Sequence, residues 1–396
     1  MARPVPAGPT VAVVERLRKR PHTHAELVET TGLARMTVHD RLEALERIGL
    51  VNLSPRNAET GGRPARRYQI AQDFGRILVA DVGTSVIRAG VATMDGTLLA
   101  TSSVEVAAFD DPSGAIDEVA AAFERFVALG EQPVRAICVG LPLSVDPTIG
   151  EPCIGPSTRA WAHVDVRRSL RRFCPGPVIV RHDVDLMALA EQRLVHPEAR
   201  VLAFIKVGMG IGCSVVWDGE PMSGENGGAF EIGHVGRRVT HARGSDRSPC
   251  VRGHDNCLET VAGGRAIASS LRLEGVGVGS SVEIMNLAVA GNTLVRDALF
   301  DTGEEVGTAV SGLLDMLNPG VVVVGGNLTT YSDLVYQGFR ETAFVRASPL
   351  VRDAARIVPA KLGVVGGLTG ACLVVLDEFY SADSLDDLVN GATPVE

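Results

Sequence analysis

The stretches 230-FEIGHV-235 and 250-CVRGHDNCLETVAG-263 form the most specific pattern in this chain. Cys250 and Cys257 flank a tight loop that contains a glycine, and zinc knuckles are built in this way. Such a knuckle would carry a further thiolate at or near position 252, but this chain has Arg252 there. The loop is therefore either a metal site with an altered ligand or the metal-free remnant of one, and the rest of the chain bears on that choice.

The composition is that of a globular protein with reduced cysteines. The chain has 396 residues, 45% of them hydrophobic and 21% charged, and this length favours two or three domains. We expect no membrane span, because no apolar run reaches about 18 residues, and no secretion signal, because MARPVPAGPT lacks an apolar centre. The odd count of 7 scattered cysteines favours free thiols in the cytoplasm over a disulfide framework.

The first 76 residues form a basic head on an acidic body. They contain 13 Lys and Arg residues against 8 Asp and Glu residues, a net charge of +5, whereas the whole chain carries −9. The remaining residues therefore carry −14. This asymmetry indicates that only the head meets a polyanion.

Three short helices are expected in the head. An apolar face runs through residues 10–20, a capping box of Thr23 and Glu26 begins the next helix, and Gly32 makes the turn into residues 34–50. The inward-facing positions are Val11, Val14, Leu17, Val38, Leu42, Leu45 and Ile48. This order predicts a helix-turn-helix.

The candidate DNA contacts lie on the third helix and in the segment that follows it. Residues 51–70 predict two strands around a Gly- and Pro-rich tip, which is a wing. Arg63 at the tip suits a narrow minor groove, and Arg66 and Arg67 suit the adjacent phosphates. The third helix would meet a major groove with Arg35, Thr37, His39 and Arg41. The alternative is a small helical domain with a solvated basic surface.

The body contains two strand hairpins with Gly-rich turns. Residues 76–100 predict the first hairpin, in which the N–H groups of Gly83 and Thr84 would face phosphate oxygens and Asp81 would hold a metal or a water. Residues 201–219 predict the second hairpin. Plain hairpins often have such turns, so the first signal is weak by itself.

The order of the motifs resembles the ROK family of bacterial sugar kinases and sugar-responsive repressors, which has the duplicated actin-like ATPase fold. The shared motifs are Asp-x-Gly-x-Thr/Ser at position 81, HD at 182, GMGIG at 208, ExGH at 231, a Cys loop that ends in CLE at 259, and NPxxxxxGG that ends at 326. The resemblance implies an α/β protein: a winged helix-turn-helix over 1–72, then a two-lobed ROK body with lobe 1 over 73–182 and lobe 2 over 183–396. The C-terminal helix would pack back on lobe 1.

The resemblance also implies a sugar between the lobes. The side chains that would hold its hydroxyls are His182, Asp183, Glu231, His234 and Glu259. Carboxylates and imidazoles suit vicinal hydroxyls, which donate and accept hydrogen bonds. Asp183 stands where the kinases have their general base, and His182 replaces the usual Asn. Taken singly, these residues could instead be a helix cap, a core-edge histidine and a surface pair.

The nucleotide side departs from the family pattern. The kinases have Asp-x-Gly-Gly-Thr-Lys, whereas this chain has DVGTSV over 81–86, so one Gly and the Lys are missing. The degenerate nucleotide site would comprise Asp81, Gly83, Thr84, Gly208, Gly210, Gly325 and Gly326. We therefore expect no ATP binding and no enzyme, with Asp183 as a vestigial catalytic residue.

The loop from Cys250 to Cys257 corresponds to the zinc site of the family, which uses the His of ExGH and three Cys. The matching positions here are His234, Cys250, Arg252 and Cys257, and arginine cannot bind the metal. His254, within the same loop, would restore four ligands in a Cys2His2 site, and His241 is also nearby in sequence. A structural Zn²⁺ with this set and a metal-free loop both stay open.

We interpret the chain as a sugar-responsive transcriptional regulator, with repression released by the sugar. Its head would bind palindromic duplex operator DNA as a homodimer or homotetramer. One alternative is a working sugar kinase with a DNA-binding head, which Asp183 favours and the altered phosphate loops disfavour. The other is a regulator controlled by a protein partner.

Overall fold

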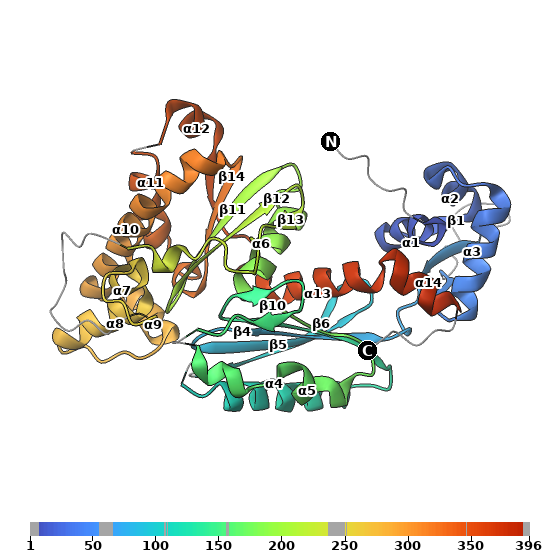
Figure 1. The fold of residues 1–396 in the computed structure, drawn as a ribbon, viewed down its shortest axis with the longest axis horizontal. Helices are drawn as coiled ribbons and strands as arrows, with labels where there is room; N and C mark the ends of the chain where they lie inside the picture. The colour runs from blue at the N-terminus through green and yellow to red at the C-terminus, as the bar shows by residue number, and fades with distance from the viewer. Residues whose placement is uncertain are drawn as a thin grey trace.

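A head and two lobes follow one another along the chain (Figure 1). The computed structural model describes residues 8–54, 66–106, 108, 110–155, 158–236, 250, 252–345 and 347–390. Among these residues no single helix is long and apolar enough to cross a membrane, although the bent pair 363–379 and 382–390 meets the length and composition criteria together, at an angle of 59°.

The head contains the three predicted helices and a small antiparallel sheet of order β1-β3-β2. Its elements are α1 (Pro9–Lys19), β1 (His22–Thr23), α2 (His24–Thr31), α3 (Arg35–Arg47), β2 (Val51–Leu53) and β3 (Arg67–Ile70). The capping box is confirmed, because the side chains of Thr23 and Glu26 each accept the other's backbone N–H. The wing strands β2 and β3 pair as predicted, while the tip with Arg63 lies outside the described residues.

Two inward positions of the head differ from the prediction. Helix α1 buries Thr10, Val13, Val14 and Leu17, so Val13 takes the place expected for Val11, which is only half-buried. Ile48 follows the end of α3 and is half-buried, whereas Val38, Leu42 and Leu45 are buried as predicted. Residues 10, 13, 14 and 17 thus form the buried face of α1, because they lie on one side of the helix.

Lobe 1 is a five-stranded sheet of order β10-β7-β4-β5-β6 with helices on both faces. Its elements are β4 (Arg76–Val82), β5 (Val86–Thr93), β6 (Leu98–Glu105), α4 (Pro112–Val127), β7 (Val134–Leu141), α5 (Val166–Leu170) and β10 (Val178–His182), with the short pair β8 (Val145–Asp146) and β9 (Glu151–Pro152) beside them. The strands β4, β5 and β6 form an antiparallel meander, and β4, β7 and β10 run parallel. The hairpin predicted over 76–100 is therefore confirmed and continues into a third strand.

Lobe 2 repeats the same plan, with sheet order β13-β12-β11-β14-β15. Its elements are α6 (Asp183–Leu194), β11 (Val201–Val207), β12 (Ile211–Trp217), β13 (Glu220–Pro221), α7 (Leu258–Ala262), α8 (Gly264–Leu273), α9 (Ser281–Val289), α10 (Thr293–Leu317), β14 (Val321–Gly325), α11 (Leu334–Ala343), α12 (Pro349–Ala354) and β15 (Arg356–Pro359). A meander is again followed by two parallel strands, so the two sheets are duplicates in topology.

The chain then returns to lobe 1 through α13 (Gly366–Phe379) and α14 (Ala382–Asn390). Helix α13 packs on β4, β7 and α6, runs along the lobe 1 sheet and reaches the head beside α1 (Figure 1). Glycine makes this packing close: a Cβ at Gly370 would lie 2.0 Å from the carbonyl oxygen of Leu186 in α6. Buried side chains of α1, lobe 1, α13 and α14 form one continuous hydrophobic core.

Candidate functional site

The ExGH motif forms a short 3-10 turn, Ile232–His234, that holds two candidate sugar ligands. Gly233 is required there, because a Cβ at this position would lie 2.3 Å from the carbonyl oxygen of Ile211 at the start of β12. The ring of His234 lies between two carboxylates, with Nε2 3.8 Å from Glu231 Oε2 and Nδ1 3.8 Å from Glu259 Oε1. Three of the five predicted sugar residues are therefore together.

Glu231 is bound from both lobes. The hydroxyl of Ser144, in the segment between β7 and β8, contacts Oε1, and Arg252 donates from Nη2 to Oε2 at 2.9 Å. Burial and the charge of Arg252 lower the pKa of His234 to about 4, so its imidazole is neutral at neutral pH. A neutral imidazole can both donate and accept a hydrogen bond, or bind a metal.

The other two predicted sugar residues lie where β10 leads into α6. Asp183 is the first residue of α6, and His182 precedes it with Nε2 3.8 Å from Asp183 Oδ1. Lys206, on the neighbouring strand β11, forms an ion pair with Asp183 Oδ2. A sugar kinase would need the carboxylate of Asp183 as a free general base. Here that carboxylate is bound by Lys206, and Asp183 is only 2% exposed.

The turn 208–210 joins β11 and β12, and Gly212 lies in β12 opposite Lys206 of β11. A Cβ at Gly210 would lie 3.1 Å from Glu259 Oε2, and one at Gly212 would lie 3.8 Å from the Cβ of Lys206. Gly210 thus lets Glu259 approach this backbone closely, whereas a Cβ at Gly212 would make only an ordinary van der Waals contact. The group of Glu231, His234 and Glu259 therefore lies at the start of β12, while Asp183 contacts the adjacent strand β11 through Lys206.

In the predicted nucleotide site, backbone groups that could bind a phosphate already form hydrogen bonds within the protein. The N–H groups of Gly83 and Gly208, which a phosphate would need, donate within their own turns to Val86 O at 3.0 Å and Gly210 O at 2.9 Å. Gly326 has φ +104°, and a Cβ there would lie 2.4 Å from Val207 O, so the glycine serves the packing of β11.

Side chains also bridge the lobes at this point. Ser85 Oγ lies 3.1 Å from Ser281 Oγ, and Arg88 Nη2 donates to Asn327 Oδ1 at 3.1 Å. Asp81 is buried nearby, and burial followed by the charge of Asp183 raises its pKa to about 6. Its Oδ1 has no hydrogen-bond partner among the described residues.

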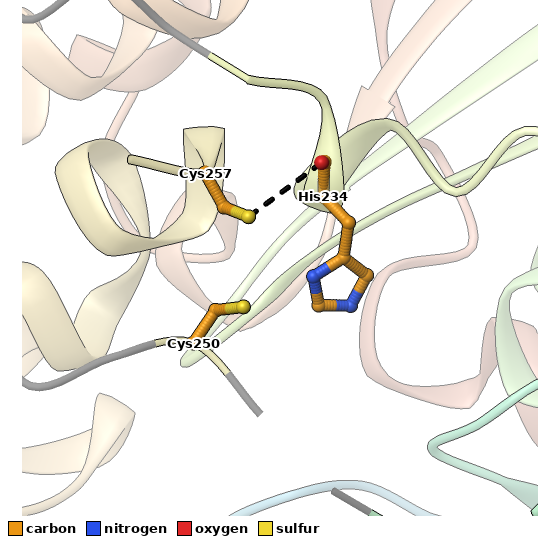
Figure 2. A group of neighbouring side chains, drawn as sticks. All are labelled: His234, Cys250 and Cys257. Carbon is orange, nitrogen blue, oxygen red and sulfur yellow. Dashed lines mark hydrogen bonds between the residues drawn. The ribbon is translucent and has the colours of Figure 1, made fainter. Parts of the chain in front are cut away.

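Three of the four predicted metal ligands form a compact group. The ligand atoms of His234, Cys250 and Cys257 all lie within 4.8 Å of one another, and Figure 2 shows both sulfurs and a ring nitrogen of His234 directed to one point. His234 Nδ1 is buried and, in the described part of the chain, has no hydrogen-bond partner. These observations fit a metal, because borderline-soft Zn²⁺ prefers thiolate and imidazole ligands.

The remaining loop residues have distinct positions. His254 lies outside the compact group, although its Nδ1 is 3.8 Å from Cys257 Sγ and its carbonyl accepts the N–H of Cys250 at 2.7 Å. Arg252 directs its guanidinium to Glu231 and donates its backbone N–H to Cys250 Sγ at 3.2 Å. Burial raises the pKa of Cys257 to about 11, so without a metal this residue is a thiol. His241 lies outside the described residues.

The predicted DNA-binding residues of the head differ in their exposure and in their side-chain contacts. Arg35 and His39 on α3 and Arg66 before β3 are exposed, and Thr37 and Arg41 on α3 are half-buried. Arg67 donates to Pro21 O at 3.0 Å and to Glu26 Oε1 at 3.3 Å. Its guanidinium therefore ties β3 to the start of α2 within the head.

Sequence reasoning missed Lys206, Ser144 and the lobe-bridging pair Arg88 and Asn327. Lys206 had a signal: it is one of three lysines in the chain and interrupts the apolar run VLAFIKV. Ser144 and Arg88 had none, because their partners lie 87 and 239 residues away in sequence.

Comparison with known proteins agrees with the duplicated fold and the motif order. The ROK family model matches residues 77–378. The xylose repressor of Caldicellulosiruptor bescii is 22% identical over 376 residues, covering 91% of this chain and 92% of that protein. The kanosamine kinase of Amycolatopsis mediterranei is 30% identical over 241 residues, covering 60% and 74%. A crystal structure of a ROK family transcriptional regulator, a homolog of the E. coli MLC protein, matches with a TM-score of 0.73 at 20% identity, covering 96% and 98%. Because the family model spans most of its length, this chain belongs to the ROK family.

Proposed function

We propose that the chain is a transcriptional repressor whose operator affinity is controlled by a sugar bound at the ExGH and HD side chains. The observation that carries this proposal is the fusion of a basic helix-turn-helix head to a ROK body through one continuous core. The full-length similarity to a xylose repressor supports it. A two-fold symmetric dimer would read a palindromic site with Arg35, Thr37, His39 and Arg41 in the major groove and Arg63 and Arg66 beside it.

The proposed sugar site combines polar groups near the start of β12 with polar groups where β10 leads into α6. Its members are His182, Asp183, Glu231, His234 and Glu259. Ser144 of lobe 1 contacts Glu231 of lobe 2, so a sugar that binds Glu231 competes with or completes a contact between the lobes. A sugar would change operator affinity only by the difference between its affinities for the two lobe arrangements.

The body is proposed to have lost phosphoryl transfer. A general base must be free to accept the proton of the attacking hydroxyl, and the ion pair with Lys206 opposes this at Asp183. The N–H groups of Gly83 and Gly208 already donate within the protein. A nucleotide would have to break these contacts and the Arg88–Asn327 bridge before it could bind.

We also propose one structural Zn²⁺ held by His234, Cys250 and Cys257, with His254 as the fourth ligand. The orphaned Nδ1 of His234 supports the site, and His254 needs only a small movement because it is already 3.8 Å from Cys257 Sγ. A bound metal would fix His234 between Glu231 and Glu259.

The test is selection of duplexes from a randomised DNA library by the full-length protein, followed by binding titrations with D-xylose, D-glucose and D-glucosamine. We expect an inverted repeat to be enriched and one of the sugars to weaken its binding. Absence of any enriched sequence would overturn the proposal. Sugar phosphorylation by ATP that disappears in Asp183→Asn would instead identify a kinase.

A further inference from the structure

Helix α6 has the candidate sugar residue Asp183 at one end and contacts the last turn of α13 at the other. Asp183 is its first residue, and Arg193 lies ten residues later, so the two are about 15 Å apart along the helix axis. The helix is held closely to α13, because Gly370 of α13 lies against the backbone of Leu186. A shift at Asp183 would therefore move Arg193 and α13 with it.

Asp377, near the end of α13, contacts both α6 and the head. Its Oδ2 forms an ion pair with Nη1 of Arg193, and its Oδ1 lies 4.0 Å from Nη1 of Arg18 in α1. One carboxylate thus joins the far end of α6 to the first helix of the DNA-binding head. Figure 1 shows the end of α13 reaching the head beside α1.

A second contact holds Arg18 in place. Its guanidinium lies over the ring of Tyr380, 5.0 Å from the centroid, and the hydroxyl of Tyr380 donates to the carbonyl of Met94 at 2.8 Å. Tyr380 is buried and is therefore fixed to lobe 1. Arg18 consequently rests on a rigid ring on one side and on the carboxylate shared with α6 on the other.

We propose that Asp377 is the positioning residue that sets the orientation of the head according to the position of α6. This inference rests on the proposed function and specifies how the sugar site would reach the operator. When α6 moves, Arg193 pulls Asp377, and Asp377 changes the electrostatic support of Arg18 and hence the docking of α1 on lobe 1.

The exposure of the contacts suits a positioning role better than a stabilising one. The side chains of Asp377, Arg18 and Arg193 are 42%, 24% and 25% exposed, and ion pairs at such sites contribute little to folding stability. Loss of the carboxylate should therefore leave the fold intact and change the relation between head and body. This separation makes the proposal testable by substitution.

The test compares full-length wild type with Asp377→Asn, the charge-restoring Asp377→Glu, and Glu124→Gln, which removes the exposed Arg172–Glu124 pair of lobe 1 as a matched control. Hydrogen exchange of residues 9–19 is measured in the free protein. We expect exchange at least threefold faster in Asp377→Asn and wild-type exchange in the other two variants. Unchanged exchange in Asp377→Asn would overturn the proposal.

A second measurement tests whether DNA binding at the head affects α6. With the duplex enriched by the wild-type protein, we expect DNA binding to alter exchange over residues 183–194 in wild type and Glu124→Gln, and not in Asp377→Asn. Retention of this change in Asp377→Asn would overturn the coupling role. If no duplex is enriched, the proposed function fails, while exchange of α1 in the free protein still decides whether Asp377 holds the head.

Discussion

The junction between the lobes has two polar regions that differ in what their side chains bind. At the proposed sugar site, the side chain of Glu231 is 23% exposed and contacts Ser144 of the other lobe, whereas Asp183 is 2% exposed and paired with Lys206. On the nucleotide side, Asp81 is 1% exposed, and Ser85, Arg88 and Asn327 bind across the lobes or to their neighbours. In both regions protein side chains pair with one another, and the difference is that Glu231 of the proposed sugar site stays partly exposed whereas Asp81 is buried.

The largest expected effect tests how closed the nucleotide side is. Burial raises the pKa of Asp81 from 3.8 to about 6, so the folded protein binds a proton more tightly than the unfolded chain. The contribution of Asp81 to stability should then be greatest below about pH 4 and fall as the pH rises to about 6, a loss of about 3 kcal/mol for two units. Asp81→Asn removes this loss, so its free energy of unfolding at pH 7.5 should exceed that of wild type.

Denaturant unfolding at pH 5 and pH 7.5 measures the Asp81 effect. Asp95 is the control: burial raises its pKa, but hydrogen bonds from Thr93 and Thr97 outweigh burial and lower it. Asp95→Asn should therefore destabilise at pH 7.5. If Asp81→Asn were no more stable than wild type at pH 7.5, Asp81 would be well solvated, and the contrast between the two regions would fail.

The next effect tests whether the sugar side is the accessible one. Glu231→Ala should weaken the binding of an effective sugar by about 2 kcal/mol, roughly 30-fold, because a charged acceptor is lost. Calorimetry with the sugar and titration of sugar-free protein with the operator separate ligand loss from DNA loss. Glu225→Ala changes an exposed residue of the same segment and should bind the sugar normally. Normal sugar binding by Glu231→Ala would move the ligand elsewhere.

The Cys loop gives a smaller effect that sharpens the description of the sugar side. Arg252→Cys adds a thiolate next to His234, Cys250 and Cys257. This thiolate would replace His254 as the fourth ligand and should tighten Zn²⁺ binding by roughly tenfold. Competition with a chromophoric chelator measures the affinity, and Co²⁺ absorption reports an added thiolate. Arg252→Ala, which also loses the Glu231 contact, should not show the added thiolate band. Equal affinity in wild type and Arg252→Cys would mean that position 252 does not face the ligand group.

The sequence predicted the elements and motif positions well, because these depend on local patterns. The capping box of Thr23, the strand that ends at His182 and the glycine turn after β11, which the structure confines to 208–210, all follow from neighbouring residues. The pairing of Lys206 with Asp183 depends on how β11 lies beside α6, and no local pattern encodes it. The contact of Arg252 with Glu231 likewise depends on where the tertiary structure places the two residues, which residue spacing alone does not fix.

The smallest effect concerns the bridge that closes the nucleotide side. Arg88→Ala removes the hydrogen bond to Asn327 Oδ1, but the Asn327 amide still donates to Ser281 Oγ at 3.4 Å, so the loss should be about 1 kcal/mol. Thermal unfolding with and without ATP and Mg²⁺ measures both stability and access. We expect a small decrease in melting temperature and no added protection by ATP, because the N–H of Gly83 still donates to Val86 and the family's Lys is absent at position 86. Protection of Arg88→Ala by ATP would show that the Arg88 side chain alone had blocked the site. The nucleotide region would then still be able to bind its ligand once that side chain is removed.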